Sequence, residues 1–120
     1  MVEHWTKSRN ELLGDNADME LISSDNMTVC KFNIKNPVEL GCHVHEHEQI
    51  TIVSGGEMII EYNGIAKEMR AGDVCIIPGN VPHKASITKA PFQSFDIFTP
   101  ARKDFIGNMV SNEGKSLEEI

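Results

Sequence analysis

The sequence is short of cysteine, aromatic residues, positive charge and long apolar runs. Three of its 120 residues are cysteines and 6% are aromatic. Eighteen acidic residues against eleven basic ones give a net charge of −7, and the basic residues are scattered along the chain. Such a surface suits neither nucleic acid nor an anionic membrane, so we expect neither as a partner. An apolar content of 40% without a bilayer-spanning run indicates one soluble domain over residues 1–120.

The cysteines are too few and too widely spaced for a disulfide framework. Cys30, Cys42 and Cys75 are odd in number and form no Cys-x-x-Cys pair, which favours a reducing compartment. The N-terminus has no basic stretch followed by a long apolar run, so no secretory signal is indicated. We therefore expect a cytoplasmic protein. Cys42 has the opposite strand parity to its neighbour His43, which predicts a small core residue.

From about residue 19 to residue 99 the sequence has the pattern of many short antiparallel strands. Apolar or alternating runs are separated about every eight to twelve residues by Gly, Pro, Asn or Asp. In residues 28–34, Cys30, Phe32 and Ile34 fall on one face, and Lys31 and Asn33 fall on the other. So many strands in a small domain must close on themselves or expose edges. An all-β barrel or jelly-roll sandwich is therefore predicted.

Three local elements are also predicted. Residues 57–62 and 65–69 form a hairpin in this prediction, because Asn63-Gly64 tolerates the positive φ angles of a type I′ turn. Residues 8–13 and 101–109 are each predicted to form a short helix, and the polar tail 111–120 is predicted to fray.

A cluster of histidines is the strongest chemical signal. His43, His45 and His47 lie within five residues. Residues two apart in a strand share a face about 7 Å apart, so His43 and His45 are able to bind one ion. A tight turn brings Gln49 back beside them as an amide oxygen ligand, and His83, after a Pro/Gly/Asn turn, is a candidate fourth ligand. The alternatives are a solvated His-rich turn and a hydrogen-bonded core histidine at position 83. We interpret His47 as a solvated turn residue, and the alternative is that it supports the metal ligands from behind.

A second group of polar residues lies near the end of the predicted sheet. Residues 93–105 indicate a last strand followed by a short helix after Pro100. Asp96 is expected to be at least half buried, because both faces of this strand are partly apolar. A buried carboxylate needs a partner, and Arg102 is the nearest cation in sequence. One interpretation is an Asp96–Arg102 ion pair that fixes the helix to the barrel, and the other is a functional site.

The histidine segments resemble the two cupin motifs, G-x5-H-x-H-x3,4-E/Q-x6-G and G-x5-P-x-G-x2-H-x3-N. The resemblance implies a cupin barrel, which is a double-stranded β-helix or jelly roll, over about residues 19–99 with short terminal helices, and with a C-terminal helix and tail over residues 100–120. It implies one divalent metal ion, with Zn, Ni, Mn and Fe all compatible. The implied ligands are His43, His45, Gln49 and His83.

The sequence departs from the motifs at four positions. Pro37 and Asn80 replace glycines, and Ile87 replaces the closing asparagine, but none of the three is an implied ligand. Asn is the non-glycine residue that most readily adopts a left-handed backbone, so Asn80 is a mild change. Gln49 stands where many cupins have Glu, which makes all four ligands neutral and argues against oxygen-activating iron chemistry.

The segment Asp-x-Phe-x-Pro-x-Arg-x-Asp-Phe, from Asp96 to Phe105, is similar to the KdgF family of small cupins in pectin and alginate catabolism. This resemblance implies a metal-dependent enzyme that opens the ring of 4,5-unsaturated monouronates to give 5-keto-4-deoxyuronate. Asp96 and Arg102 would be catalytic, and Phe98 and Arg102 would bind the substrate, a small carboxylated sugar.

Two alternatives to this function remain open. One is another metallocupin that acts on a small acid as a lyase or dioxygenase, and the other is a non-catalytic cupin that binds a sugar or carboxylate. The apolar residues on outward strand faces also lead us to expect a homodimer.

Overall fold

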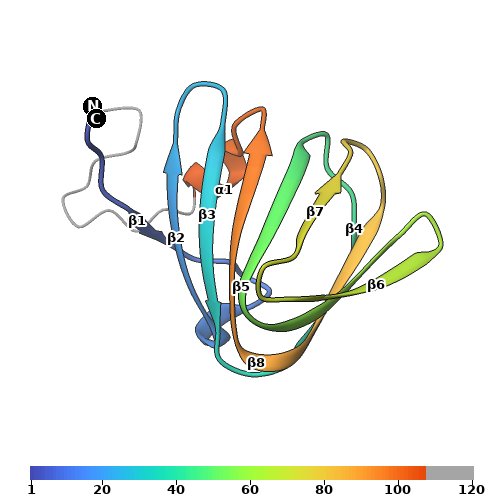
Figure 1. Cartoon of the computed structure of the whole chain (residues 1–120). Coiled ribbons are helices and arrows are strands. Elements are labelled where there is room, and N and C mark those ends of the chain that lie inside the picture. The colour runs from blue at the N-terminus through green and yellow to red at the C-terminus, as the bar shows by residue number, and fades with distance from the viewer. Residues whose placement is uncertain (108–120) are drawn as a thin grey trace.

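The computed structural model describes residues 1–107 and is almost entirely β (Figure 1). In chain order the elements are β1 (Thr6–Ser8), the 3-10 turn η1 (Gly14–Asn16), β2 (Ala17–Ser23), β3 (Thr28–Ile34), β4 (Val38–His43), β5 (Glu48–Tyr62), β6 (Ile65–Arg70), β7 (Val74–Ile77), β8 (His83–Thr99) and α1 (Lys103–Gly107). No helix among these residues is long and apolar enough to cross a membrane.

Two long strands, β5 and β8, organise the sheet. The strand order is β1-β2-β3-β8-β5-β6, with β4 also paired to β8 and β7 also paired to β5. The antiparallel β5–β8 ladder shifts register between Val53 and Met58, and there both strands bend. On one side of the bend they pair with β7 and β3, and on the other side with β6 and β4. The sheet folds over on itself, as Figure 1 shows, and the prediction of an all-β jelly roll is confirmed.

The inner surface of the folded sheet holds the apolar core. Burial alternates residue by residue along β3, and Cys30, Phe32 and Ile34 are buried as the period-two pattern predicts. The hairpin between β5 and β6 is also confirmed, because Asn63 and Gly64 have φ angles of 53° and 74°.

The predicted helix over residues 8–13 is wrong. Strand β1 pairs with β2 through Lys7 and Glu20, and the chain then turns. The side-chain oxygen of Asn10 accepts hydrogen bonds from the backbone N–H groups of Leu12 and Leu13 at 3.0 and 3.2 Å. This local bonding competes with a helix, and burial of Leu13 in the core fixes the turn.

The chain end matches the prediction within the described residues. Helix α1 lies inside the predicted range 101–109 and follows Pro100. Residues 108 and 109 and the predicted fraying of 111–120 lie outside the described residues.

Cys42 is exposed, so its prediction as a core residue is wrong. The ladder between β4 and β8 shifts register between Leu40 and His43. This irregularity breaks the strict alternation on which the prediction relied.

We predict that Gly56→Ala destabilises the protein far more than Gly64→Ala. Both glycines have a φ of +74°, so both substitutions carry the same left-handed strain of about 1–2 kcal/mol. A Cβ at position 56 would lie 2.5 Å from the Lys89 carbonyl oxygen and 2.7 Å from that of Pro91, whereas a Cβ at position 64 meets nothing within 4 Å. Urea unfolding measures the difference, which we expect to exceed about 2 kcal/mol. Equal losses in the two variants would contradict close backbone contact at the bend.

Candidate functional site

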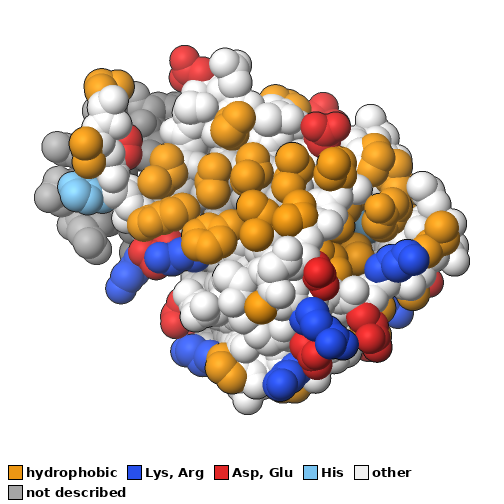
Figure 2. Space-filling model, viewed as in Figure 1, with side chains coloured by type: hydrophobic (Ala, Val, Ile, Leu, Met, Phe, Trp, Pro, Cys, Tyr) orange, Lys and Arg blue, Asp and Glu red, His pale blue; other side chains and the backbone are white. Residues whose placement is uncertain are grey.

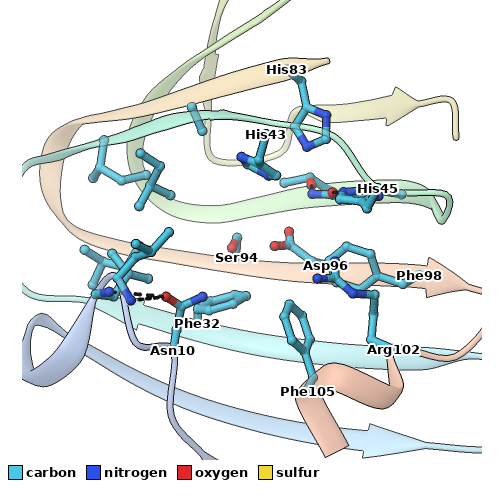
Figure 3. A pocket seen from close by; sticks show the side chains of 18 of the residues that line it. Asn10, Phe32, His43, His45, His83, Ser94, Asp96, Phe98, Arg102 and Phe105 are labelled. Carbon is cyan, nitrogen blue, oxygen red and sulfur yellow. Dashed lines mark hydrogen bonds between the residues drawn. The ribbon is translucent and has the colours of Figure 1, made fainter. Parts of the chain in front are cut away.

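Three histidines from two segments of the chain lie close together (Figure 3). His43 ends β4 and is paired in register with His83, which begins β8, while His45 lies between β4 and β5. One ring nitrogen of each lies within 4.8 Å of the others. The three side chains are therefore positioned to bind one metal ion.

The backbone selects the tautomer of all three imidazole rings. Each Nδ1 lies close to a backbone carbonyl oxygen two residues away: 3.0 Å for His43 and Gly41, 2.9 Å for His45 and His47, and 2.9 Å for His83 and Val81. A carbonyl only accepts hydrogen bonds, so a neutral ring carries its proton on Nδ1 and has a lone pair on Nε2. The Nε2 atom of His83 is buried and has no hydrogen-bond partner. An unpaired buried acceptor of this kind fits a metal ligand.

Gln49 lies where an oxygen ligand is needed. This buried side chain places Oε1 3.1 Å from Nε2 of His45. Its Nε2 donates a hydrogen bond of 2.9 Å to Oγ1 of Thr51, which orients the amide. The lone pairs of Oε1 of Gln49 and Nε2 of His45 therefore face each other with no proton between them, which is repulsive. A cation bound by both atoms would remove this repulsion. The residues present fit a divalent ion held by three imidazoles and one amide oxygen.

The surroundings of His45 and His83 favour the neutral form of both rings. Burial lowers the pKa of His45, and the charges of Arg102 and His83 lower it further. Burial also lowers the pKa of His83, to which His43 and Arg102 contribute. Neutral imidazole is the form that binds metals, so little proton competition is expected near neutral pH.

A close backbone contact holds the loop that carries these ligands. The backbone N–H of Asn80 donates a hydrogen bond of 2.8 Å to the His45 carbonyl. Gly79 lies so close to the Glu46 carbonyl oxygen that a Cβ there would overlap with it. Asn80 has a φ of 62°, which explains how an asparagine replaces the second-motif glycine.

Asp96 points into the same cavity but is not paired with Arg102. The residue is half-buried, and its Oδ1 atom is fully buried without a hydrogen-bond partner. Burial raises the pKa of the Asp96 carboxyl to about 7, although a hydrogen bond from Thr51 and the charge of Arg102 act in the opposite direction. The carboxyl therefore exchanges a proton near neutral pH.

Arg102 is held by a different carboxylate and by two aromatic rings. Its Nε and Nη2 atoms donate hydrogen bonds of 3.0 and 2.7 Å to Asp104, which replaces the expected pair with Asp96. The guanidinium carbon lies 4.8 Å from the ring centroid of Phe98 and 3.8 Å from that of Phe105. These contacts fix a positive charge on the cavity wall near Asp96 (Figure 3).

The cavity has a volume of about 390 Å³ and two chemically different parts. The histidines, Gln49, Asp96 and Arg102 line one part. Apolar side chains, including Phe32, Ile34, Met58, Ile87 and Phe92, line much of the rest, together with the polar residues Arg9, Asn10, Glu11 and Ser94. The cavity therefore fits a small molecule with a charged or metal-binding end.

The structure brings together every residue proposed from sequence and adds others. Thr51, Asp104 and Phe105 were not singled out. Thr51 follows Gln49 by two residues, so strand parity alone places it on the same inner face. Asp104 and Phe105 belong to the quoted C-terminal motif, but their contacts with Arg102 depend on how α1 folds back. His47 lies outside the three-histidine cluster, with its ring 5.5 Å from that of His45.

The family model of the cupin domain matches residues 35–98, which is more than half of the chain. The chain therefore belongs to the cupin family, as its fold and histidine motifs indicate.

Solved structures support this assignment at the level of the fold. The structure of KdgF from Halomonas sp. has a TM-score of 0.72 and 20% identity, with 85% of this chain and 90% of that chain covered. An RmlC-like cupin from Shewanella frigidimarina has a TM-score of 0.73 and 26% identity, with 88% and 97% covered. A mutant of the oxalate decarboxylase OxdC from Bacillus subtilis has a TM-score of 0.68 and 14% identity, with 83% and 30% covered. Among curated protein sequences, none matches.

We predict that a divalent metal stabilises the wild-type protein and that His83→Ala removes the effect. A free metal concentration of about 100 times the Kd adds about 2.7 kcal/mol, which corresponds to a rise in Tm of about 10 °C for a chain of this size. Thermal unfolding with and without Zn²⁺ or Ni²⁺ measures this shift, and elemental analysis gives the stoichiometry. His47→Ala is the matched control, and this variant should retain both the metal-induced rise in Tm and the metal stoichiometry of the wild type. An equal Tm shift in the two variants would exclude His83 as a ligand.

We also predict that Asp96→Asn stabilises the metal-free protein more at pH 8 than at pH 5. Folding raises the pKa of this carboxyl from 3.8 to about 7, so its contribution to stability is full at low pH and is lost as the pH rises through 7. Asparagine cannot ionise and avoids that loss. The gain in unfolding free energy should be about 1–3 kcal/mol larger at pH 8, as measured by urea unfolding. If the gain in unfolding free energy does not change with pH, then Asp96 is already ionised at pH 5 in the folded protein, which would contradict the prediction.

Proposed function

We propose that this cupin is a metal-dependent enzyme that opens the ring of 4,5-unsaturated monouronates to give 5-keto-4-deoxyuronate. The observation that carries the proposal is that one cavity holds a three-histidine cluster, a buried carboxyl with a pKa of about 7 and a fixed guanidinium. The proposal is also supported by the C-terminal motif that resembles KdgF and by the fold shared with KdgF from Halomonas sp..

Substrate binding is assigned to Arg102 and Phe98. The guanidinium of Arg102 binds the substrate carboxylate, and Asp104 holds the guanidinium in place. Phe98 is buried against the site, with its ring 5.8 Å from that of His45, and limits access of water. Arg102 keeps donor capacity because Asp104 engages only its Nε and Nη2 atoms.

Proton transfer is assigned to Asp96. In its ionised form the carboxylate takes the proton from the anomeric hydroxyl, so a C1 carbonyl forms and the bond from C1 to the ring oxygen breaks. The electron pair moves to the ring oxygen and produces an enolate. Asp96 then gives the proton to C4, which completes the C5 ketone and leaves no net change in protons. A divalent ion bound by His43, His45, Gln49 and His83 supplies Lewis-acid polarisation of the substrate's oxygen atoms.

Thr51 is a positioning residue in this scheme. Its hydroxyl oxygen accepts a hydrogen bond from Gln49, so the hydroxyl proton is available to Asp96, its register partner across β5 and β8. Thr51 therefore connects the orientation of the Gln49 amide with that of the proton carrier.

The free cysteines are compatible with a reducing cytoplasm, which we include in the proposal. In the cytoplasm, the proposed binding partner of the protein is its substrate, the small carboxylated sugar. Nucleic acid and membranes have no role in the proposal.

An assay with 4,5-unsaturated galacturonate tests the function. The metal-loaded protein should remove the double-bond absorbance faster than the spontaneous reaction does. Asp96→Asn should lower kcat by about 10²–10⁴-fold with metal retained, because the proton carrier is lost. Arg102→Ala should raise KM by about 10–100-fold, and Asp104→Asn should raise it less, because the guanidinium remains.

Arg70→Ala is the control, since Arg70 is an exposed cation that lies outside the cavity. No acceleration with any divalent metal would refute the proposed reaction. Unfolding of both the Asp96 and the Arg102 variant, with unchanged activity per folded molecule, would instead assign these residues a structural role.

The apolar part of the cavity favours a second candidate, a metallocupin that acts on or binds a small acid with an apolar body. Met58, Ile87 and Phe92 offer no hydrogen-bonding side chain to sugar hydroxyls. A thermal-shift comparison of the uronate with aliphatic and aromatic carboxylates of similar size distinguishes the two candidates. Stronger stabilisation by the apolar acids would favour the second.

A further inference from the structure

The cavity contains two uncharged polar side chains that the proposed chemistry does not use. Asn10, in the turn that follows β1, and Ser94, in β8, both line the cavity. Ser94 is 3% exposed, and Figure 3 draws no hydrogen bond to its hydroxyl from the other cavity residues shown. Buried hydroxyls normally have a hydrogen-bond partner, so this one is available to a ligand. We call Asn10 and Ser94 the polar pair.

Local hydrogen bonds fix the direction of the Asn10 amide. Its Oδ1 accepts hydrogen bonds of 3.0 and 3.2 Å from the backbone N–H groups of Leu12 and Leu13. Backbone N–H groups only donate, so the amide oxygen faces the turn and the NH₂ group faces away from it. The Asn10 carbonyl also accepts a hydrogen bond of 2.8 Å from the N–H of Gly14, which holds the turn. Figure 3 shows the amide nitrogen on the side toward Ser94, so Asn10 presents donors to the cavity.

The usual alternation of an antiparallel sheet is inverted where Ser94 lies. Ser94 and Asp96 line the cavity, whereas Phe95 and Ile97 are not among the described residues of its wall. Strand alternation places these two apolar side chains on the outward side of the sheet. Apolar side chains gather there in a band across the middle of Figure 2. Because such sheets normally place apolar residues inward and polar ones outward, the inward polar residues indicate contact with a polar ligand.

We propose that Asn10 and Ser94 bind the hydroxyl groups on C2 and C3 of the substrate ring. This inference rests on the proposed function and narrows its substrate class to a cyclic uronate with two free neighbouring hydroxyls. The NH₂ group of Asn10 donates to a hydroxyl oxygen. The hydroxyl of Ser94 both donates and accepts, so it matches a group that does the same.

The order of the residues along the cavity matches the order of the groups around the ring. In a six-membered uronate C1 and C4 lie opposite each other, with C5 and the ring oxygen on one side and C2 and C3 on the other. Asp96 is assigned to the C1 hydroxyl and to C4, and Arg102 to the carboxylate on C5. The hydroxyls on C2 and C3 then point away from Arg102. In Figure 3, Arg102 and Asn10 lie on opposite sides of Asp96, and Ser94 lies between Asp96 and Asn10.

The charged residues near the polar pair do not offer the same contact. Arg9 and Glu11 also line the cavity, but both are exposed. Nη1 of Arg9 already donates a hydrogen bond of 3.2 Å to Asp15. The half-buried Asn10 and the buried Ser94 are neutral, which suits hydroxyl groups better than a second carboxylate. The cavity therefore fits a ligand with one anionic end and one hydroxylated end.

The binding of two stable ring acids tests the proposal without any ring opening. Galacturonate carries the hydroxyls, and tetrahydropyran-2-carboxylate has the same ring and carboxylate without them. Calorimetric titration of the metal-loaded protein gives a Kd for each acid. Ser94→Ala and Asn10→Ser should each raise the Kd of galacturonate about 3–10-fold, because each removes one uncharged hydrogen bond. Neither variant should change the Kd of tetrahydropyran-2-carboxylate.

The variants are chosen to keep the fold. In Asn10→Ser the new hydroxyl oxygen still accepts hydrogen bonds from the turn, and only the NH₂ group is lost. Both variants should keep the metal-induced rise in Tm. Ser86→Ala is the matched control, because Ser86 lies in the same strand outside the described cavity wall, and it should change neither Kd.

Three results would overturn the proposal. One is a galacturonate Kd that is the same in the wild type and in both variants. Another is an equal rise in Kd for the two acids, which would mean that the polar pair shapes the cavity without contacting hydroxyls. The third is a wild type that does not bind galacturonate, or that binds tetrahydropyran-2-carboxylate at least as tightly.

Failure of this inference is distinguishable from failure of the proposed function. A protein that binds galacturonate through the polar pair but does not open the unsaturated ring would retain the inference and refute the reaction. A protein that opens the ring with the same KM in the wild type, Ser94→Ala and Asn10→Ser would retain the reaction and refute the inference.

Discussion

The candidate site depends on one repeated interaction, the contact between each imidazole Nδ1 and a backbone carbonyl oxygen. Lone pairs on three converging rings repel one another, and each ring presents its lone pair to the cluster only if its proton is held on the other nitrogen. The carbonyls of Gly41, His47 and Val81 fix them from outside the cluster. The metal-binding geometry is thus part of the backbone fold, and the carbonyl of His47 contributes although its ring lies outside the cluster.

The bend in β5 and β8 determines what surrounds that cluster. Because the two strands pair on both sides of the bend, His83 and Asp96 belong to one strand but approach the cavity from different layers of the sheet. The close backbone contact at Gly56 makes this folding possible. A single pair of strands therefore supplies a metal-binding histidine, the amide of Gln49 and the buried carboxyl.

The sequence predicted the core strands well, because burial along them follows period two. Cys30, Phe32 and Ile34 lie where alternation puts them. His43, His45 and Gln49 also come together, but His45 lies in the turn after β4, so the turn and not strand parity brings them together. Predictions failed where local hydrogen bonds or irregular register outweigh periodicity, as at Asn10 and Cys42.

The partner of Arg102 was out of reach of sequence reasoning for a different reason. Asp104 is closer to Arg102 in sequence than Asp96 is, but sequence distance alone does not decide which carboxylate the guanidinium reaches. The choice depends on the turn into α1, which folds Asp104 back onto the guanidinium while Asp96 stays on the strand.

The pairing of Arg102 with Asp104 has chemical consequences. Had Arg102 paired with Asp96, the cation would have held the pKa of this carboxyl well below neutrality, and the guanidinium would have been unavailable to a substrate. Pairing with Asp104 instead leaves Asp96 buried without an ion-pair partner, with a pKa of about 7, and keeps a positive charge stacked on Phe105 at the cavity wall. The geometry thus separates the group that is able to carry a proton from the group that is able to bind an anion, and the proposed ring opening of a carboxylated sugar uses both.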